Sequence, residues 1–215
     1  MSPVFQEFLL WFPAVVIALT VHEFAHAFVA DRLGDPTARA LGRVTLNPLS
    51  HLDLMGTILL IVMHFGWGKP VPVDTRYLRN PKRDMLIIAA AGPAINVATA
   101  VIVGLGLRLL GPELLATEAG GYLYLGLQVL VLLSLLLAFF NLLPIPPLDG
   151  SKVLMGLLPA PLASAYARRA NLLSMALMGL IVLGAVTGWH PLSQLIYPPA
   201  RWLYVMLTGA GMPSG

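Results

Sequence analysis

Long apolar stretches dominate this chain, and they constrain its fold more than any other feature. A helix that crosses a bilayer needs about 20 mostly apolar residues. Five stretches approach that length, at roughly 4–30, 85–110, 122–143, 172–188 and 192–207. Only 11% of the 215 residues are charged, which is less than half of the about 25% found in soluble domains. The sequence therefore predicts an all-α polytopic membrane protein with about five transmembrane helices.

A sixth apolar stretch, 54–67, is short, and it either crosses the membrane or enters and leaves on the same side as a re-entrant or short helical segment. If it re-enters, the connections 31–53, 67–84 and 144–170 share one side and hold 11 of the 13 Lys and Arg residues. Cytoplasmic connections are enriched in Lys and Arg. We therefore expect these connections and the C-terminus to be cytoplasmic and the N-terminus to lie outside.

The connections themselves carry little regular structure in this interpretation. Residues 38–47 mix β-branched, apolar and basic side chains, a pattern that favours a small β-hairpin near the membrane interface. No repeat or low-complexity linker divides the chain. We expect a single domain over 1–215, with a core at 4–158 and additional C-terminal helices at 167–208.

Composition also limits the chemistry. The chain has no cysteine, so a bound metal must be held by His, Asp, Glu or backbone oxygen. The net charge of +3 comes from basic residues that flank apolar spans and form no patch interleaved with aromatic residues. Such residues are better explained as determinants of membrane topology. We therefore exclude nucleic acid as a partner and expect the lipid bilayer to surround the chain.

The segment His-Glu-Phe-Ala-His at 22–26 lies inside the first apolar stretch. Residues four apart share one face of a helix, so His22 and His26 are spaced to bind one zinc ion. Glu23 is then placed to take a proton from a water molecule beside the metal. A pattern of this kind also occurs by chance on soluble helices. Ionisable groups at lipid depth are costly, however, which favours a functional site over a cluster that only ties helices together.

A catalytic zinc usually has three protein ligands, and among the ten acidic residues Asp53 and Asp149 are the best-placed candidates for the third. Asp149 follows Asn141 by eight residues, at the end of an apolar stretch that three prolines interrupt. Proline breaks a helix and frees carbonyl groups that can face a polar cavity. Local sequence leaves two roles open for Asp149, namely metal ligand and N-cap of a short helix at 151–158.

The stretches 47–56 and 68–74 resemble the compact prokaryotic branch, without PDZ or CBS domains, of the site-2 protease family of intramembrane zinc metalloproteases. Three further segments together resemble that family as a whole. They are 22–26, the Gly-Pro-Ala-Ile-Asn segment at 92–96, and 141–150. The resemblance covers roughly residues 15–155. It implies one Zn²⁺ per chain held by His22, His26 and Asp149, with Glu23 as the catalytic base. It also implies the cell membrane of a prokaryote as location.

Three further polar residues are candidates for substrate binding or for stabilising an oxyanion. The resemblance implies that Asn96 and Asn141 lie near the site, where an amide can donate a hydrogen bond. The competing role for each is a hydrogen bond between helices. His51 either approaches the metal from a re-entrant segment or is a structural histidine with satisfied hydrogen bonds.

The expected activity is that of a zinc endopeptidase that cleaves transmembrane or juxtamembrane segments of membrane proteins, as in regulated intramembrane proteolysis. The active site would open toward the cytoplasm. One alternative is a metal transporter, which would favour ionisable residues spread along a path through the bilayer. Another is a family member that binds membrane segments without proteolysis. A homo-oligomer is compatible with the sequence.

Overall fold

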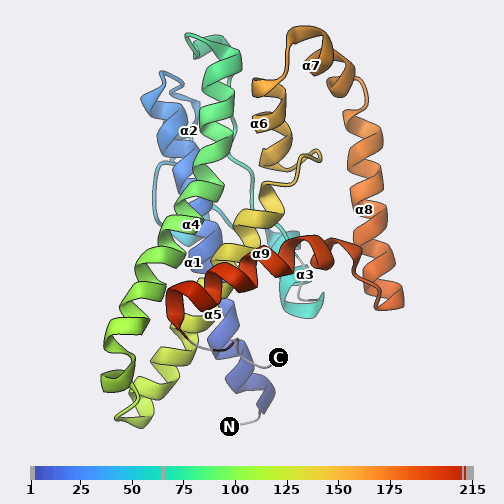
Figure 1. The fold of residues 1–215 in the computed structure, drawn as a ribbon. Coiled ribbons are helices and arrows are strands. Elements are labelled where there is room, and N and C mark those ends of the chain that lie inside the picture. The colour runs from blue at the N-terminus through green and yellow to red at the C-terminus, as the bar shows by residue number, and fades with distance from the viewer. Residues whose placement is uncertain (1–2, 64–65, 210, 212–215) are drawn as a thin grey trace.

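The computed structural model describes residues 3–63, 66–209 and 211. Four helices in this part are long and apolar enough to cross a membrane (Figure 1). They are α1 (Pro3–Arg32), α4 (Pro81–Leu114), α5 (Glu118–Asn141) and α8 (Ala170–Thr187). These helices correspond to four of the five long apolar stretches, so the mostly helical fold with several candidate membrane spans is confirmed.

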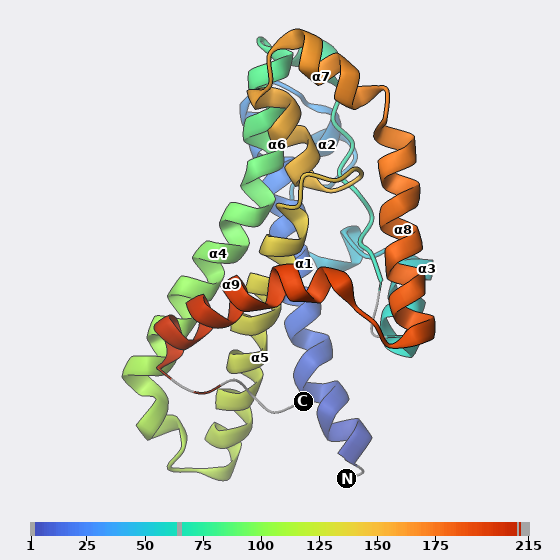
Figure 2. The ribbon, with the colours of Figure 1, turned by 45° about the vertical axis from the view of Figure 1, so that its right-hand side comes forward.

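A bundle of α1, α4 and α5 forms the centre of the molecule (Figures 1 and 2). The α4 helix begins at Pro81 behind Asn80, whose side chain accepts the Arg83 backbone N–H. The α5 helix begins behind Thr117, which caps the Gly120 backbone N–H. Such side-chain caps satisfy backbone donors that have no partner inside the helix.

Small residues allow these helices to approach closely. Ala14 and Ala18 of α1 are buried against Leu130 of α5. Lipid chains are as apolar as these side chains, so close van der Waals packing between small residues drives helix association in a membrane. The alanines of α1 therefore fix how the helix carrying His22 and His26 sits against its neighbours.

Shorter elements complete the fold around this bundle. The α6 helix (Asp149–Leu157) packs against α4, and α7 (Ala160–Ala167) leads from it to α8. The described residues of the connection between α1 and α4 form four short elements, α2 (Thr37–Ala40), η1 (Pro48–Ser50), α3 (Leu54–Met63) and η2 (Thr75–Tyr77). The α3 helix has ten residues and is about 15 Å long, half the thickness of the hydrocarbon core. Residues 64–65 of the expected 54–67 segment lie outside the described residues.

The fifth expected span, 192–207, is not confirmed as a membrane crossing. It forms α9 (Pro191–Thr208), which lies across α4 and α5 (Figures 1 and 2). Its buried face, with Ala200, Tyr204 and Leu207, packs against both helices. Pro198, Pro199 and Arg201 make this segment less apolar than the four long helices. An apolar length alone does not separate a crossing helix from one that packs across a bundle.

The hairpin expected at 38–47 is not confirmed either. These residues form most of α2 and the turns after it, and no strand occurs in the described ranges. The only β contact recorded there is an isolated bridge between Leu52 and Gly68. The β-branched residues that suggested strands are too few to outweigh helix and turn formation around Gly42, whose φ of 67° requires a left-handed backbone.

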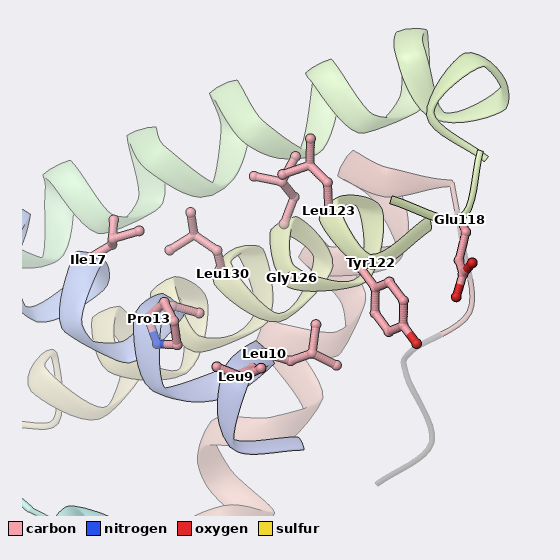
Figure 3. A pocket seen from close by; sticks show the side chains of 11 residues that line it. Leu9, Leu10, Pro13, Ile17, Glu118, Tyr122, Leu123, Gly126 and Leu130 are labelled. Atoms are coloured by element: carbon pink, nitrogen blue, oxygen red, sulfur yellow. The ribbon is translucent and has the colours of Figure 1, made fainter. Parts of the chain in front are cut away.

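An apolar hollow of about 600 Å³ lies between the N-terminal parts of α1 and α5 (Figure 3). Its walls are apolar side chains such as Leu10, Ile17 and Leu130, with Glu118 and Tyr122 toward one end. Neither His22, His26 nor Asp149 lines it. This hollow is therefore separate from the cluster of ionisable residues described next.

Candidate metal centre

His22 and His26 lie one helical turn apart on α1, and their imidazole rings face each other edge to face. The ring centroids are 4.7 Å apart with an interplanar angle of 85°. The two Nε2 atoms are 3.1 Å apart. Both residues are buried, with exposed fractions of 3% and 7%. Buried polar groups are costly unless they have hydrogen-bond partners, so these two imidazoles need a polar partner from another element of the fold.

Asp149 is that partner, although it lies in a distant part of the chain. Its Oδ2 lies 3.1 Å from His22 Nε2 and 3.0 Å from His26 Nε2. Asp149 is the first residue of α6, and Leu148 occupies the N-cap position, so its carboxylate is free to face the histidines. Burial works to raise the pKa of this carboxyl, but the hydrogen bonds with His22 and His26 outweigh burial and hold the pKa below its usual value. The group is therefore an ionised acceptor, as a metal ligand must be.

These three atoms fit the requirements of a zinc site. They are mutually 3.0–3.1 Å apart, and the centre of such a triangle is about 1.8 Å from each corner. Zinc–nitrogen and zinc–carboxylate distances are about 2.0–2.2 Å, so a point just outside the plane satisfies all three. Two imidazoles and one carboxylate are also a donor set found in catalytic zinc sites. Among the described residues, this is the only group of three or more His, Cys, Asp or Glu placed to hold a metal ion.

Helix α4 lies against both histidines and orients His26. His26 Nδ1 donates to the backbone carbonyl of Ile88 at 2.7 Å, which leaves Nε2 facing the cluster. Such outer partners fix the tautomer and ring orientation of metal-binding histidines. Gly92 lies one turn further along α4, where a Cβ atom would come within 2.4 Å of His26 Nε2 and 2.6 Å of His22 Cε1. A side chain at this position would therefore force both imidazole rings to move.

Gly92 is a functional residue whose role was not evident from the sequence. It appeared there only as part of the Gly-Pro-Ala-Ile-Asn segment. A glycine inside a long apolar helix costs stability relative to alanine and usually has a packing or functional reason. That signal was present, but it does not say which side chains approach the glycine.

Glu23 is half-buried beside the cluster on α1, and its carboxylate makes no hydrogen bond or ion pair with the described residues. Its electrostatic neighbours include His26 and Arg43. Arg43 is buried in the connection after α2, where its guanidinium donates to the carbonyls of Lys69 and Pro70. A carboxylate without a hydrogen-bond partner beside a candidate metal site is free to accept a proton from water.

The three residues predicted to bind substrate or stabilise an oxyanion have different surroundings. His51 is fully buried, and its Nε2 donates to the Thr45 carbonyl at 2.7 Å, so it does not join the metal cluster. Asn141 donates back to Leu137 on its own helix at 3.0 Å. Asn96 is fully buried, and neither its Oδ1 nor its Nδ2 has a partner. It lies one turn beyond Gly92 on α4, on the face that meets the histidines.

Comparison with known proteins identifies the family. The model of the family described as "Peptidase family M50" matches residues 115–185. YwhC of Bacillus subtilis (strain 168), named as an inferred zinc metalloprotease, is 43% identical over 149 residues, which cover 67% of this chain and 67% of YwhC. The chain belongs to peptidase family M50. This family contains the site-2 proteases, so the resemblance stated from the three sequence segments is confirmed.

Other relatives of this M50 peptidase carry similar names. Rip2 of Mycobacterium tuberculosis (strain ATCC 25618 / H37Rv), also named as an inferred zinc metalloprotease, is 33% identical over 180 residues, or 81% of this chain and 67% of Rip2. Rip2 of Mycolicibacterium smegmatis is 38% identical over 151 residues, or 66% of this chain and 55% of that protein. No solved structure matches the chain. This M50 peptidase is therefore a metallopeptidase of the site-2 protease type, and its family implies a zinc cofactor.

Proposed function

We propose that this M50 peptidase cleaves peptide bonds within or beside transmembrane segments of other membrane proteins, as in regulated intramembrane proteolysis. His22, His26 and Asp149 hold one zinc ion, and Glu23 is the general base. The convergence of three buried ligand atoms from α1 and α6 supports this proposal most strongly. Family membership and four helices of membrane-spanning length point in the same direction.

Each residue has a defined task in the proposed reaction. A zinc ion bound to the cluster supplies Lewis acidity, which polarises the scissile carbonyl and makes water easier to deprotonate. Glu23 takes the proton of the attacking water and delivers it to the leaving amine nitrogen. The Ile88 carbonyl holds the His26 imidazole in place, and the lack of a side chain at Gly92 leaves room for both rings. Because the cluster is buried, charged groups there interact strongly with little screening by water.

Asn96 is the better of the two asparagines for stabilising the oxyanion. Its amide has no partner among the described residues, whereas the Asn141 amide is already bonded to Leu137. A buried amide without a partner costs about 1–3 kcal/mol. A substrate carbonyl that develops negative charge would recover that cost by accepting a hydrogen bond.

The substrate has to lose helical structure before cleavage. A helix hides its carbonyls in internal hydrogen bonds, and exposed backbone groups are tolerated at membrane depth only inside protein or beside water. The charge distribution supports a cytoplasmic site in a prokaryotic cell membrane, since the connections 31–53 and 67–84 near the cluster are rich in Lys and Arg.

A comparison of membrane-protein fragments in cells tests the proposed activity. Cells carrying the parent enzyme should accumulate fragments cut within or beside a transmembrane segment, and cells carrying Glu23→Gln should not. Glu113→Gln is a matched control, because Glu113 is exposed near the end of α4 far from the cluster. Identical fragment patterns for the parent and Glu23→Gln would contradict the proposed proteolytic activity.

A further inference from the structure

A second hollow lies where α1 ends and α4 begins, and none of the residues that line it is assigned to the proposed reaction. Its volume is about 400 Å³, and residues 32–34, 79–80, 83–84 and 87 line it. The two candidate spans Phe8–Arg32 and Pro81–Gly111 terminate here, and the helices pack along each other (Figures 1 and 2). In the topology that the charge distribution supports, the hollow lies at the boundary between lipid and water.

The hollow carries unneutralised positive charge. Arg32, Arg79 and Arg83 line it, and none of their guanidinium groups makes a hydrogen bond or ion pair with another side chain in residues 3–63, 66–209 and 211. Other arginines of these connections do have partners. For example, Arg39 binds Asp31, the acidic neighbour of Arg32, and Arg76 binds Asp74.

Only one carboxylate offsets these charges inside the hollow. Asp84 is 6% exposed, and its Oδ2 accepts the Asn80 backbone N–H at 2.9 Å. Three guanidinium groups against one carboxylate leave a net charge of two positive units in the hollow. The three guanidinium groups are exposed, so water screens their mutual repulsion, but their shared positive charge still attracts anions. The site therefore favours an anionic ligand.

An apolar surface continues from the charged rim along α1. The Arg32 guanidinium lies 4.7 Å above the Phe28 ring, which is itself exposed and stacks on Phe24 with centroids 5.7 Å apart. Such a cation–π contact holds the guanidinium at a defined position. Ile87 adds an apolar side chain to the wall of the hollow. A charged head above an apolar face matches an amphiphile better than a free inorganic anion.

We propose that this hollow binds the phosphate group of an acidic phospholipid, whose acyl chains lie along α1 below Arg32. Arginine suits this ligand because its planar fork donates two hydrogen bonds to phosphate oxygens. Basic pockets between transmembrane helices recognise acidic lipid head groups in this way. The bound lipid ties the end of α1 to the start of α4, next to Ile88, whose carbonyl orients His26.

Lipid titration of the delipidated, full-length protein, followed by native mass spectrometry, tests this proposal. The probes are dioleoyl phosphatidylglycerol, dioleoyl phosphatidylcholine and inorganic phosphate, in separate arms. The pocket variant is Arg79→Gln with Arg83→Gln. The control is Arg168→Gln with Arg169→Gln, which removes the same charge from exposed positions between α7 and α8. Parent and control should bind phosphatidylglycerol at least about tenfold more tightly than phosphatidylcholine, and the pocket variant about 30-fold more weakly than the parent.

Three results would overturn the proposal. They are equal binding of the two lipids by the parent, unchanged phosphatidylglycerol binding in the pocket variant, and an equal loss in the control pair. Displacement of phosphatidylglycerol by an equal concentration of inorganic phosphate would assign the hollow to a soluble anion instead. If the double variant does not fold, Arg79→Gln and Arg83→Gln are measured singly, and each should weaken binding about fivefold.

Discussion

Replacement of Gly92 by alanine should disable the metal centre without unfolding the protein. The added methyl carbon would lie 2.4 Å from His26 Nε2 and 2.6 Å from His22 Cε1, whereas ordinary contact begins at 3.4 Å. The two rings must therefore withdraw by about 1 Å, which exceeds the about 0.5 Å tolerance of a functional site. Disturbing the support of a metal ligand costs about 10–100-fold in affinity or activity. We expect Gly92→Ala to bind zinc at least about tenfold more weakly and to lose cleavage accordingly.

Zinc competition with a chromophoric chelator measures this effect, and thermal unfolding of the zinc-free protein measures stability. The matched control is Gly106→Ala on the same helix, where a Cβ would meet nothing within 4 Å. Both changes favour helix by about 0.5–1 kcal/mol, so loss of zinc in Gly92→Ala alone must come from the collision. Parent-like zinc affinity in Gly92→Ala would refute the reasoning that α4 supports the histidines through this contact.

Three other perturbations test separate parts of the account. Asp149→Asn keeps the size of the side chain but removes its charge, so zinc content measured by mass spectrometry should fall, and full retention would contradict the ligand assignment. Asn96→Leu should raise the free energy of unfolding by about 1–3 kcal/mol because a buried amide without partners is removed, while lowering kcat. A destabilised but fully active variant would assign Asn96 to structure. Since the chain has no cysteine, Thr75→Cys and Ala116→Cys report topology cleanly. An impermeant maleimide added to intact cells should label only Ala116→Cys, and the reverse pattern would invert the proposed orientation.

The four long helices followed from sequence because a run of about 20 apolar residues has few alternatives to a membrane helix. The same argument predicted a span at 192–207 that is not confirmed, because the length of this stretch does not reveal that Ala200 and Tyr204 of α9 pack across α4 and α5. It also did not exclude the hairpin at 38–47, because strand formation depends on a partner that local sequence does not specify.

The sequence predicted part of the candidate site, as it predicted part of the fold. The spacing of His22 and His26 follows from helix periodicity alone. The position of Asp149 does not, because its local sequence is equally typical of a helix cap, and only the fold shows that Leu148 takes that position. The contacts of Gly92 and the Ile88 carbonyl depend on how α4 packs on α1. The spacing of residues along one helix does not reveal its contacts with another helix.

Zinc content and cleavage, measured side by side on purified parent and Glu23→Gln, test the central claim most directly. Glu23 is proposed as a base and not as a ligand, so both proteins should hold one zinc ion per chain. Only the parent should cleave a transmembrane substrate identified in cells, with the rate for Glu23→Gln reduced at least about 100-fold. Cleavage by Glu23→Gln at a rate within a few-fold of the parent would contradict the account, as would zinc-loaded parent enzyme that cuts no membrane segment.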